Sequence, residues 1–521
     1  MNLTQFVVGD TWSQTDSLSD YPASAGWVLK TRFVYDGAGS PFTISSTASG
    51  DDHVTTIAAA VTAAWTAGAC TWFQFVEDGA GKSISIGNGK ITLLPDPRTA
   101  TTPIDMRTAA QIGLDNVRAV LRGTASQGVL SYSIAGRSLR FGSLLTEGYV
   151  AEETHPVAER VYGAGAIVHA RTTTPEFSCA AFTHSKLWGI TRNPWNPDYT
   201  PGGSSGGSGA ALASGTAYLA SGSDIGGSIR IPSSYCGVVG FKAPYGRVPA
   251  LPPFSLDTYC HDGAMGRTVA DVALFHNVIQ GQHPFDHVSL PALPIPEELG
   301  DVAGKRIALA VTIGDFPVEP QVEANTRAFA DALKAAGAIV DEVVVDLTME
   351  RLMDAALVHF GAIMGPSMEE LAPADDPRYT DYARHFMATA AAGFARSNVY
   401  AGIVGEAGVH RAIADVLVDH DALITPTIGG YGFLAGQEYA DGVDVAGQHL
   451  DFYLLACLTP VFNVASRHPV LNVPSGLAPN GVPTGVQVVA RPYDDVTAFH
   501  VGAAAERELG IWNDPSWRPS L

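Results

Sequence analysis

Residues 1 to about 95 alternate short runs of aromatic and β-branched side chains with turn residues. The pattern predicts strands over residues 27–36, 42–48, 71–78 and 82–94. The pairs Asp36-Gly37 and Asn88-Gly89 are expected to form the turns between them. Together these features predict a small β-sandwich over residues 1–95, with Trp27, Trp65 and Trp72 as candidates for its core.

Residues 96–140 predict a linker, one helix and a hairpin. Proline-containing sequence at 95–102 is typical of a linker. Residues 108–122 place Ile112, Val117 and Leu121 on one face of an amphipathic helix, and residues 131–141 predict the hairpin. We therefore expect two separable units, with the boundary between about residues 125 and 145.

From residue 141 to residue 521, apolar strand candidates alternate with helices. Residues 305–311 and 338–346 flank a helix predicted over 322–336, which is a βαβ unit. Residues 166–170 and 421–427 are further strand candidates. This alternation predicts an α/β domain with a mixed, mostly parallel sheet covered by helices on both faces.

Residues 202–232 read GGSSGGSGAALASGTAYLASGSDIGGSIRIP. Glycine at this density lets the backbone approach a ligand, and successive N–H groups can form a concavity for an oxyanion. A flexible linker is disfavoured because periodic apolar sequence continues on both sides. A P-loop is disfavoured because no Gly-Lys-Ser/Thr follows the glycines.

This stretch resembles the signature of the amidase signature family, which are serine hydrolases with a Ser-cisSer-Lys triad. The resemblance runs from about residue 141 to the C-terminus and includes TTTPEF, CGVVGFKAPYGRVP and VPTGVQVVARP. It implies the amidase-signature fold. It also implies hydrolysis of a carboxylic amide through an acyl-enzyme, with no cofactor and no metal.

The resemblance also assigns roles to individual residues. It implies that Ser228 is the nucleophile and that Ser204, after a cis peptide bond from Gly203, is the bridging serine. The implied oxyanion hole consists of the N–H groups of Ile225, Gly226, Gly227 and Ser228. The implied supporting residues are Ser205, Ser223, Asp224 and Arg230.

The lysine of the triad has no counterpart in this sequence. Counting back from Gly142-Ser143, the family's lysine position falls on Val129, and no lysine occurs between Lys90 and Lys186. A neutral lysine would take the proton from the bridging serine, and valine cannot. The resemblance therefore implies an amidase whose activity is impaired, with a catalytically inactive binding or structural protein as the alternative.

Other residues could replace the lysine, although each has a simpler interpretation. Lys186 is expected to be a solvated loop lysine, and Arg171 stays protonated. His169 on the preceding strand is expected to be buried and structural. His184 shares the loop of Lys186, and His261 is expected in the core or a loop, or alternatively in the substrate pocket.

Residues 1–140 resemble small tailed-phage virion proteins of the head–tail region. The segments GDTWSQTDSLSDYPASAGW and SYSIAGRSLR carry this resemblance. It ends where the amidase resemblance begins. We therefore expect a fusion in which a foreign module replaced the N-terminal region that carries the lysine.

The amino-acid composition limits which kinds of partner molecule the chain is expected to bind. The net charge of −21 argues against nucleic acid or an anionic membrane. Five dispersed cysteines suggest a reducing compartment without a disulfide framework or zinc site. With no signal peptide or membrane span expected, the sequence predicts a cytoplasmic enzyme for a small-molecule amide, and a homodimer is compatible with it.

Two other hydrolase interpretations are weaker. Residues 202–206 fit the Gly-x-Ser-x-Gly pattern of Ser-His-Asp hydrolases, but the preceding Asn-Pro-Trp-Asn-Pro is no strand. The glutaminase component of a tRNA amidotransferase is disfavoured by the acidic balance and the RNPWNP segment. An aryl or acyl amide substrate is suggested by aromatic residues that could equally belong to the core, namely Phe254, Tyr259, Phe433 and Tyr453.

Overall fold

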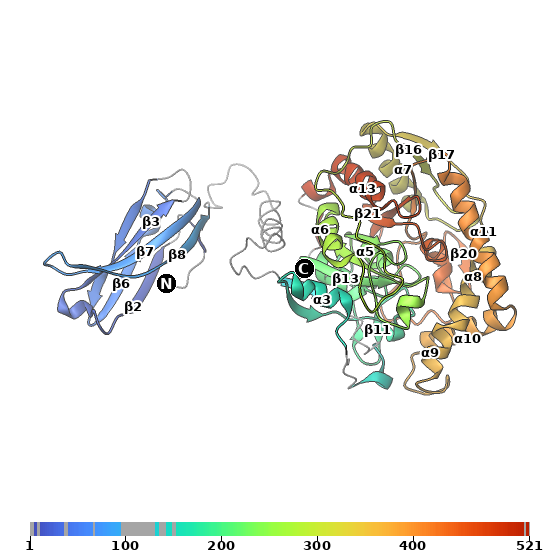
Figure 1. Cartoon of the computed structure of the whole chain (residues 1–521), viewed down its shortest axis with the longest axis horizontal. Coiled ribbons are helices and arrows are strands. Elements are labelled where there is room, and N and C mark those ends of the chain that lie inside the picture. Colours follow the sequence, from blue (N-terminus) through green and yellow to red (C-terminus); the bar gives the residue numbers. More distant parts are fainter. Residues whose placement is uncertain are drawn as a thin grey trace. The chain divides into compact units, whose positions relative to one another are not determined.

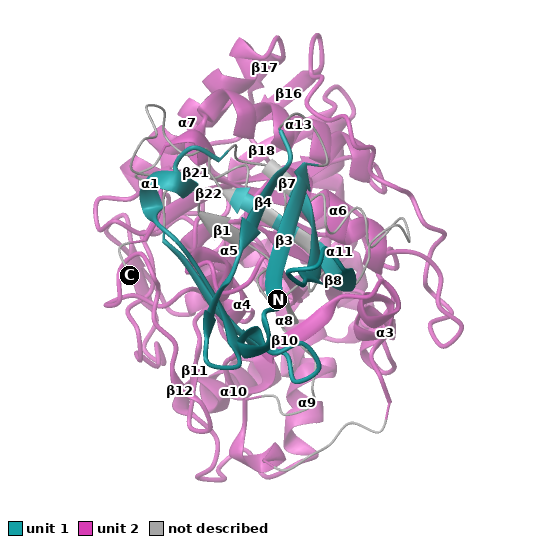
Figure 2. Ribbon diagram, turned by 90° about the vertical axis from the view of Figure 1, so that its left-hand side faces the viewer, with its two compact units in different colours: residues 1–111 teal, residues 112–521 magenta. Residues whose placement is uncertain are grey.

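The computed structural model describes most of the chain in two compact units. Unit 1 comprises residues 1–111 and unit 2 residues 112–521, and Figure 2 colours them separately. The described residues are 5–7, 11–35, 40–65, 68–94, 131–134, 142–147, 153–514 and 517–519. Among these residues, no helix has the length and apolar character needed to cross a membrane.

Unit 1 contains two small sheets. The five-stranded sheet has the order β1-β8-β7-β3-β4 and the three-stranded sheet β2-β6-β5. The strands are β1 Gln5–Val7, β2 Trp12–Ser17, β3 Val28–Tyr35, β4 Phe42–Ser45, β5 Thr47–Ser49, β6 Asp52–Ile57, β7 Gly68–Glu77 and β8 Ser83–Leu94, and the short helix α1 is Ala59–Thr62. Both sheets contribute to one core, in which Trp12 of β2 packs edge-on against Phe33 of β3. The predicted β-rich N-terminal part is therefore confirmed.

The turn expected at Asn88-Gly89 is wrong. Both residues lie inside β8, where Gly89 pairs with Trp72 of β7. A Cβ on Gly89 would lie 2.6 Å from the Trp72 ring. Glycine at position 89 therefore leaves room for the buried indole of Trp72. The Asn-Gly pair, which is typical of a hairpin turn, here reflects packing between two strands.

Unit 2 is built on a ten-stranded sheet of order β10-β9-β13-β15-β14-β21-β22-β18-β16-β17. Its strands are β9 Ser131–Ile134, β10 Ile167–Arg171, β13 Leu219–Asp224, β14 Val239–Lys242, β15 His261–Gly266, β16 Arg306–Leu309, β17 Ile339–Glu342, β18 Ala422–Pro426, β21 Val470–Leu477 and β22 Pro483–Ala490. Strands β16 and β17 are parallel and flank helix α7, Pro320–Ala335. The predicted βαβ unit is confirmed.

Strand direction departs from expectation in the centre of the sheet. Pairs at both ends of the order are parallel, whereas every pair from β13 through β15, β14, β21 and β22 to β18 is antiparallel. The sheet is mixed as expected, but not mostly parallel. Short connections such as the one between β21 and β22 form hairpins, which pair antiparallel.

Part of the segment expected to form a hairpin lies in this sheet. Residues 131–134 form β9, which lies parallel to both β10 and β13, and residues 135–141 lie outside the described residues. The helix expected at 108–122 and the linker at 95–102 lie outside the described residues.

Each face of the large sheet has its own core. On β18, Ala422 and Ile424 belong to one cluster and Leu423 to the other. The same alternation occurs on β16, because successive side chains of a strand point to opposite faces. Helices α6 Val269–Ile279, α7 and α13 Asp495–Leu509 cover the first face.

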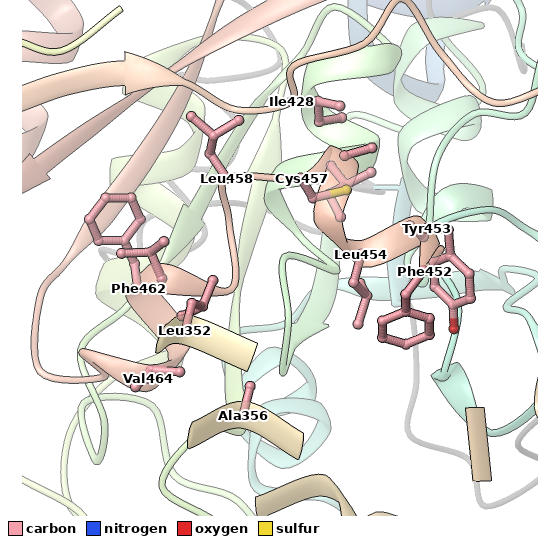
Figure 3. Packing of buried hydrophobic residues seen from close by; sticks show 14 of the residues in the cluster. Leu352, Ala356, Ile428, Phe452, Tyr453, Leu454, Cys457, Leu458, Phe462 and Val464 are labelled. Atoms are coloured by element: carbon pink, nitrogen blue, oxygen red, sulfur yellow. The ribbon is translucent and has the colours of Figure 1, made fainter. Parts of the chain in front are cut away.

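Helices on the second face enclose the region where the candidate site lies. These are α8 Met349–Ala362, α9 Met364–Glu369, α10 Asp381–Ala395 and α11 Val399–Leu417, and in Figure 1 they lie together along one side of unit 2. Figure 3 shows part of this core, where α8 residues Leu352 and Ala356 share a cluster with the segment that carries Leu454. The expected mixed sheet with helices on both faces is therefore confirmed, whereas its mostly parallel direction is not.

Candidate active site

Each glycine-serine cluster lies at the N-terminus of a helix, and a strand connects the two clusters. Helix α4, Gly206–Ala213, follows the first cluster, and β13 ends at Asp224. A turn over residues 225–229 leads into α5, Arg230–Tyr235. Ser228, which is 7% exposed, lies in this turn. The sequence therefore places the candidate nucleophile where a strand passes into a helix at the centre of the unit.

A buried carboxylate holds the turn. Asp224 Oδ1 accepts from the Gly227 N–H at 2.9 Å, and Oδ2 accepts from the Ile229 N–H at 3.1 Å. The Arg230 guanidinium donates to both oxygens, at 2.8 and 3.0 Å. The expected role of Asp224 and Arg230 in bracing the turn is thus visible in their contacts.

Arg230 is fully buried and all five of its N–H donors have acceptors. Beyond Asp224, these are the Thr459 carbonyl, Gln487 Oε1 and Asn463 Oδ1. Sequence reasoning missed these three residues, whose only signal was their position in the C-terminal segments that follow the signature. They tie the turn to segments more than two hundred residues away.

Charge pairing keeps Asp224 ionised. Burial by itself would raise the pKa of its carboxyl, but the Arg230 guanidinium and the amide of Asn463 hold that pKa below its ordinary value. Asn463 Nδ2 donates to Asp224 Oδ1 at 2.8 Å. The turn is therefore organised around a permanent buried charge pair.

The first glycine-serine cluster lies against the turn. The Gly203–Ser204 peptide bond is cis, as the resemblance predicts. The Ser205 N–H donates to the Ser228 carbonyl at 3.1 Å, and the Ser205 hydroxyl contacts the backbone N–H and carbonyl of Ser223 at 3.3 and 3.4 Å. Ser204 itself is 1% exposed. The structure thus brings the two serine segments together.

Glycine is required at two positions of this assembly. Gly227 has a φ of +125°, and a Cβ there would lie 2.1 Å from Thr459 Oγ1. A Cβ on Gly203 would lie 2.6 Å from the Ala180 carbonyl oxygen. Both close approaches let the backbone pack where no side chain fits.

The four implied oxyanion donors do not have the same surroundings. The Gly227 N–H is engaged by Asp224. Ile225, Gly226 and Ser228 instead line a pocket, together with Ser178, Cys179, Ala180, Ala181, Ile231, Phe360, Met364, Phe386 and Leu454. The Gly227 N–H is therefore already hydrogen-bonded, whereas the other three residues lie beside the pocket.

The pocket is walled by helices that the signature does not predict. Phe360 belongs to α8, Met364 to α9 and Phe386 to α10, and Leu454 lies on the short helix η5, Tyr453–Ala456. Tertiary packing alone brings these four side chains to Ser228.

Lys186, the first alternative base, is hydrogen-bonded to backbone carbonyls outside the pocket. Its side chain is exposed, and Nζ donates to the carbonyl oxygens of Pro377 and Tyr379. Arg171 is exposed on β10. Neither residue lines the pocket that contains Ser228.

The three histidine candidates also lie outside the lining of this pocket. The expectation that His169 is buried is wrong: it is exposed, because β10 is the edge strand of the sheet. His184 is buried, and its ring faces Glu438 Oε1 at 3.2 Å. His261 is buried at the start of β15, as expected for the core.

The aromatic residues considered for the substrate do not line the pocket either. Tyr259, Phe433 and Tyr453 are buried in the main core cluster, and Phe254 lies on a short helix. These aromatic residues therefore do not support an aryl or acyl substrate, because three of them pack within the core and none lines the pocket.

The position of the missing lysine, Val129, lies outside the described residues. Of the turn 140–143 from which it is counted, Gly142 and Ser143 are described. Gly142 has a φ of +62°, and the Ser143 hydroxyl donates to Glu176 of the Pro-Glu-Phe loop. Ser143 therefore contacts the loop that leads to pocket residues Ser178 and Cys179.

One buried lysine went unnoticed in the sequence. Lys242 of β14 is fully buried, and its Nζ donates to the carbonyls of Ala243, Ser466 and His468 at 3.4, 3.4 and 2.9 Å. Burial, followed by the charge of Arg230, lowers the pKa of Lys242 well below its ordinary value. Lys242 does not line the Ser228 pocket.

The chain is similar to known proteins over most of unit 2. The family model described as Amidase matches residues 131–499. The chain is 32% identical over 400 residues to a component of the glutamyl-tRNA(Gln) amidotransferase of Thermosynechococcus vestitus, covering 70% of this chain and 80% of that protein. It is 31% identical over 391 residues to the 6-aminohexanoate-cyclic-dimer hydrolase of Paenarthrobacter ureafaciens, covering 70% and 77%.

Solved structures give the same picture. A bacterial aryl acylamidase of the amidase signature family has a TM-score of 0.67 at 26% identity, covering 77% of this chain and 87% of that one. A 6-aminohexanoate cyclic dimer hydrolase has a TM-score of 0.66 at 25% identity, covering 78% and 89%. Relatives of both kinds considered above, hydrolases and an amidotransferase component, are therefore similar to this chain.

Proposed function

The chain belongs to the amidase family, whose members act on amides, and from this premise we propose that it hydrolyses a carboxylic amide through an acyl-enzyme on Ser228. The observation that carries the proposal is the place of Ser228 in the pocket wall, beside Ile225 and Gly226. The Asp224–Arg230 pair fixes the turn that presents it. Donors fixed in advance around a developing charge are an effective source of rate acceleration.

In the proposed reaction, Ser228 Oγ attacks the amide carbon, and its proton passes to the Ser204 hydroxyl as Ser204 gives its own proton to the amide nitrogen. The carbonyl oxygen gains the negative charge and accepts hydrogen bonds from the N–H groups of Ile225, Gly226 and Ser228. The C–N bond then breaks, and the amine leaves with that proton. Water hydrolyses the serine ester to release the acid and regenerate Ser228.

The missing base sets the expected rate. Loss of a positioned general base costs typically about 10²–10⁴ in rate. We propose that Val129 leaves the chain slow, or without turnover, while the nucleophile and oxyanion donors remain. A protein that binds amides without hydrolysing them is the second candidate, and Val129 is the observation that favours it.

Amide turnover by the native chain, Ser228→Ala and Val129→Lys tests the proposal. Val129→Lys is expected to raise the rate by about 10²–10⁴, and Ser228→Ala is expected to abolish it. A serine-reactive probe should label the native chain and Ser205→Ala, but not Ser228→Ala. Labelling of another serine, or turnover that survives in Ser228→Ala, would show that Ser228 is not the nucleophile.

For the N-terminal part, we propose a separate module over residues 1–95 that resembles small tailed-phage virion proteins. Its support is a core of its own, which includes Trp12, Phe33 and Trp72. Limited proteolysis should release this module by cutting within or just after residues 95–122. A chain that resists cleavage throughout that segment would contradict the proposal.

A further inference from the structure

We propose that the pocket beside Ser228 binds short, uncharged aliphatic acyl groups and excludes the charged end of an amino-acid amide such as glutamine. This inference rests on the proposed function, since it assigns the acyl side of the same reaction. It follows from three features of the pocket: its side chains, the charges around it and its size.

The pocket wall is apolar. Phe360, Met364, Phe386 and Leu454 line it, and all four are at most 7% exposed. Ile231 of α5 also lines it. Among the residues that the structure describes, no charged side chain belongs to the lining. An ammonium or carboxylate buried here would lose its hydration without gaining a partner, which is strongly unfavourable.

Two buried charged groups close in sequence to lining residues, Arg230 and Glu176, are already paired. All five donors of Arg230 are used, two of them on Asp224. Glu176 accepts from the Ser143 hydroxyl and from the backbone N–H and hydroxyl of Thr380. Neither group is available to receive the carboxylate or ammonium of an amino acid without breaking an existing network.

The pocket is also narrow. Its cavity volume is about 20 Å³, which is room for roughly one water molecule. Phe360 and Phe386 both line it, and their ring centroids lie 5.6 Å apart. Met364 is the most adaptable wall residue, because its unbranched thioether chain changes rotamer readily. The proposal therefore requires Met364 to change rotamer so that a short acyl chain can enter, with Phe360 and Phe386 limiting the length of that chain.

Ligand-observed NMR titration of Ser228→Ala tests the proposal without turnover. The probes are acetamide, butanamide, hexanamide and L-glutamine. Butanamide carries the amide chain of glutamine up to Cα and lacks its two charged groups. Affinity is expected to rise about fourfold for each methylene from acetamide to butanamide. It should then fall for hexanamide, and L-glutamine should bind at least tenfold more weakly than butanamide.

Two variants on one helix provide the matched comparison. Met364 lines the pocket, whereas Met368, buried one turn later on α9, does not. Met364→Ala is expected to move the tightest binding to hexanamide, and Met368→Ala should keep the native order. Binding of L-glutamine as tight as butanamide, absence of binding by every amide, or the same chain-length order in both variants would overturn the acyl-site proposal. These outcomes are separate from serine labelling, which tests the role of Ser228.

Discussion

Replacing Asp224 with Asn should destabilise unit 2 by an amount that the structure lets us work out. The Asp224 carboxylate accepts hydrogen bonds on both oxygens, from the backbone of Gly227 and Ile229 and from the side chains of Arg230 and Asn463. An asparagine amide has one oxygen, so its NH₂ group would face donors on the other side. Each buried donor left unpaired costs about 1–3 kcal/mol.

The charge adds to this cost. The variant would leave the Arg230 guanidinium buried without its counter-ion, and breaking a buried pair costs about 3–5 kcal/mol. We therefore expect Asp224→Asn to lower the free energy of unfolding of unit 2 by at least about 3 kcal/mol at pH 7. Loosening of the turn should lower amide turnover or serine labelling as well.

The assay is denaturant unfolding followed by circular dichroism at 222 nm. The only α-helix described in unit 1 is the four-residue α1, so this signal reports unit 2. A matched control is Asp331→Asn, because Asp331 pairs with Lys334 at 2.9 Å while its side chain is 71% exposed. An exposed pair contributes about 0–1 kcal/mol, so the control should change little.

The pH dependence gives a second check. The pKa of the Asp224 carboxyl is held below its ordinary value in the folded state, and the unfolded value is about 3.9. The stability that the ionised group contributes is therefore present above about pH 4 and lost as the pH falls below it. The gap between native and Asp224→Asn should narrow in that acid range. A difference below about 1 kcal/mol at pH 7, or a gap that does not change with pH, would refute the reasoning.

Three further predictions follow from single sites. Gly227→Ala should reduce serine labelling and stability, since its Cβ would meet Thr459 Oγ1 at 2.1 Å; unchanged labelling would contradict the fixed turn. Lys186→Met should leave amide turnover within about twofold, because Nζ is bound to two backbone carbonyls; abolished turnover would identify Lys186 as the base. Burial, with the charge of Arg247, lowers the pKa of His276 to about 3. As the pH falls from about 6.5 towards 3, the free energy of unfolding should therefore decline more steeply in the native chain than in His276→Gln, and parallel curves would exclude this role.

The sequence was most informative where function depends on consecutive residues. The run from Asp224 to Arg230 specifies its own turn, because the carboxylate, the glycines and the arginine interact within six positions of the chain. The cis bond before Ser204 was predicted from the family resemblance instead, because helix α4 and strand β13 separate its segment from Ser228 along the chain. Alternation of apolar strands and helices was likewise enough to predict a sheet covered by helices, since period-two and helical patterns reflect local burial.

Tertiary structure alone decided what surrounds the nucleophile. Thr459, Asn463 and Gln487 complete the donors and acceptors of Arg230, and helices α8 to α10 supply the pocket wall. No local pattern marks these residues, because a core position and a pocket position have the same apolar character in a sequence. The sequence also did not predict the antiparallel centre of the sheet, or the Trp72 indole that fills the space beside Gly89. Strand pairing and cross-strand packing join residues that are distant in the chain, and local propensity does not identify such partners.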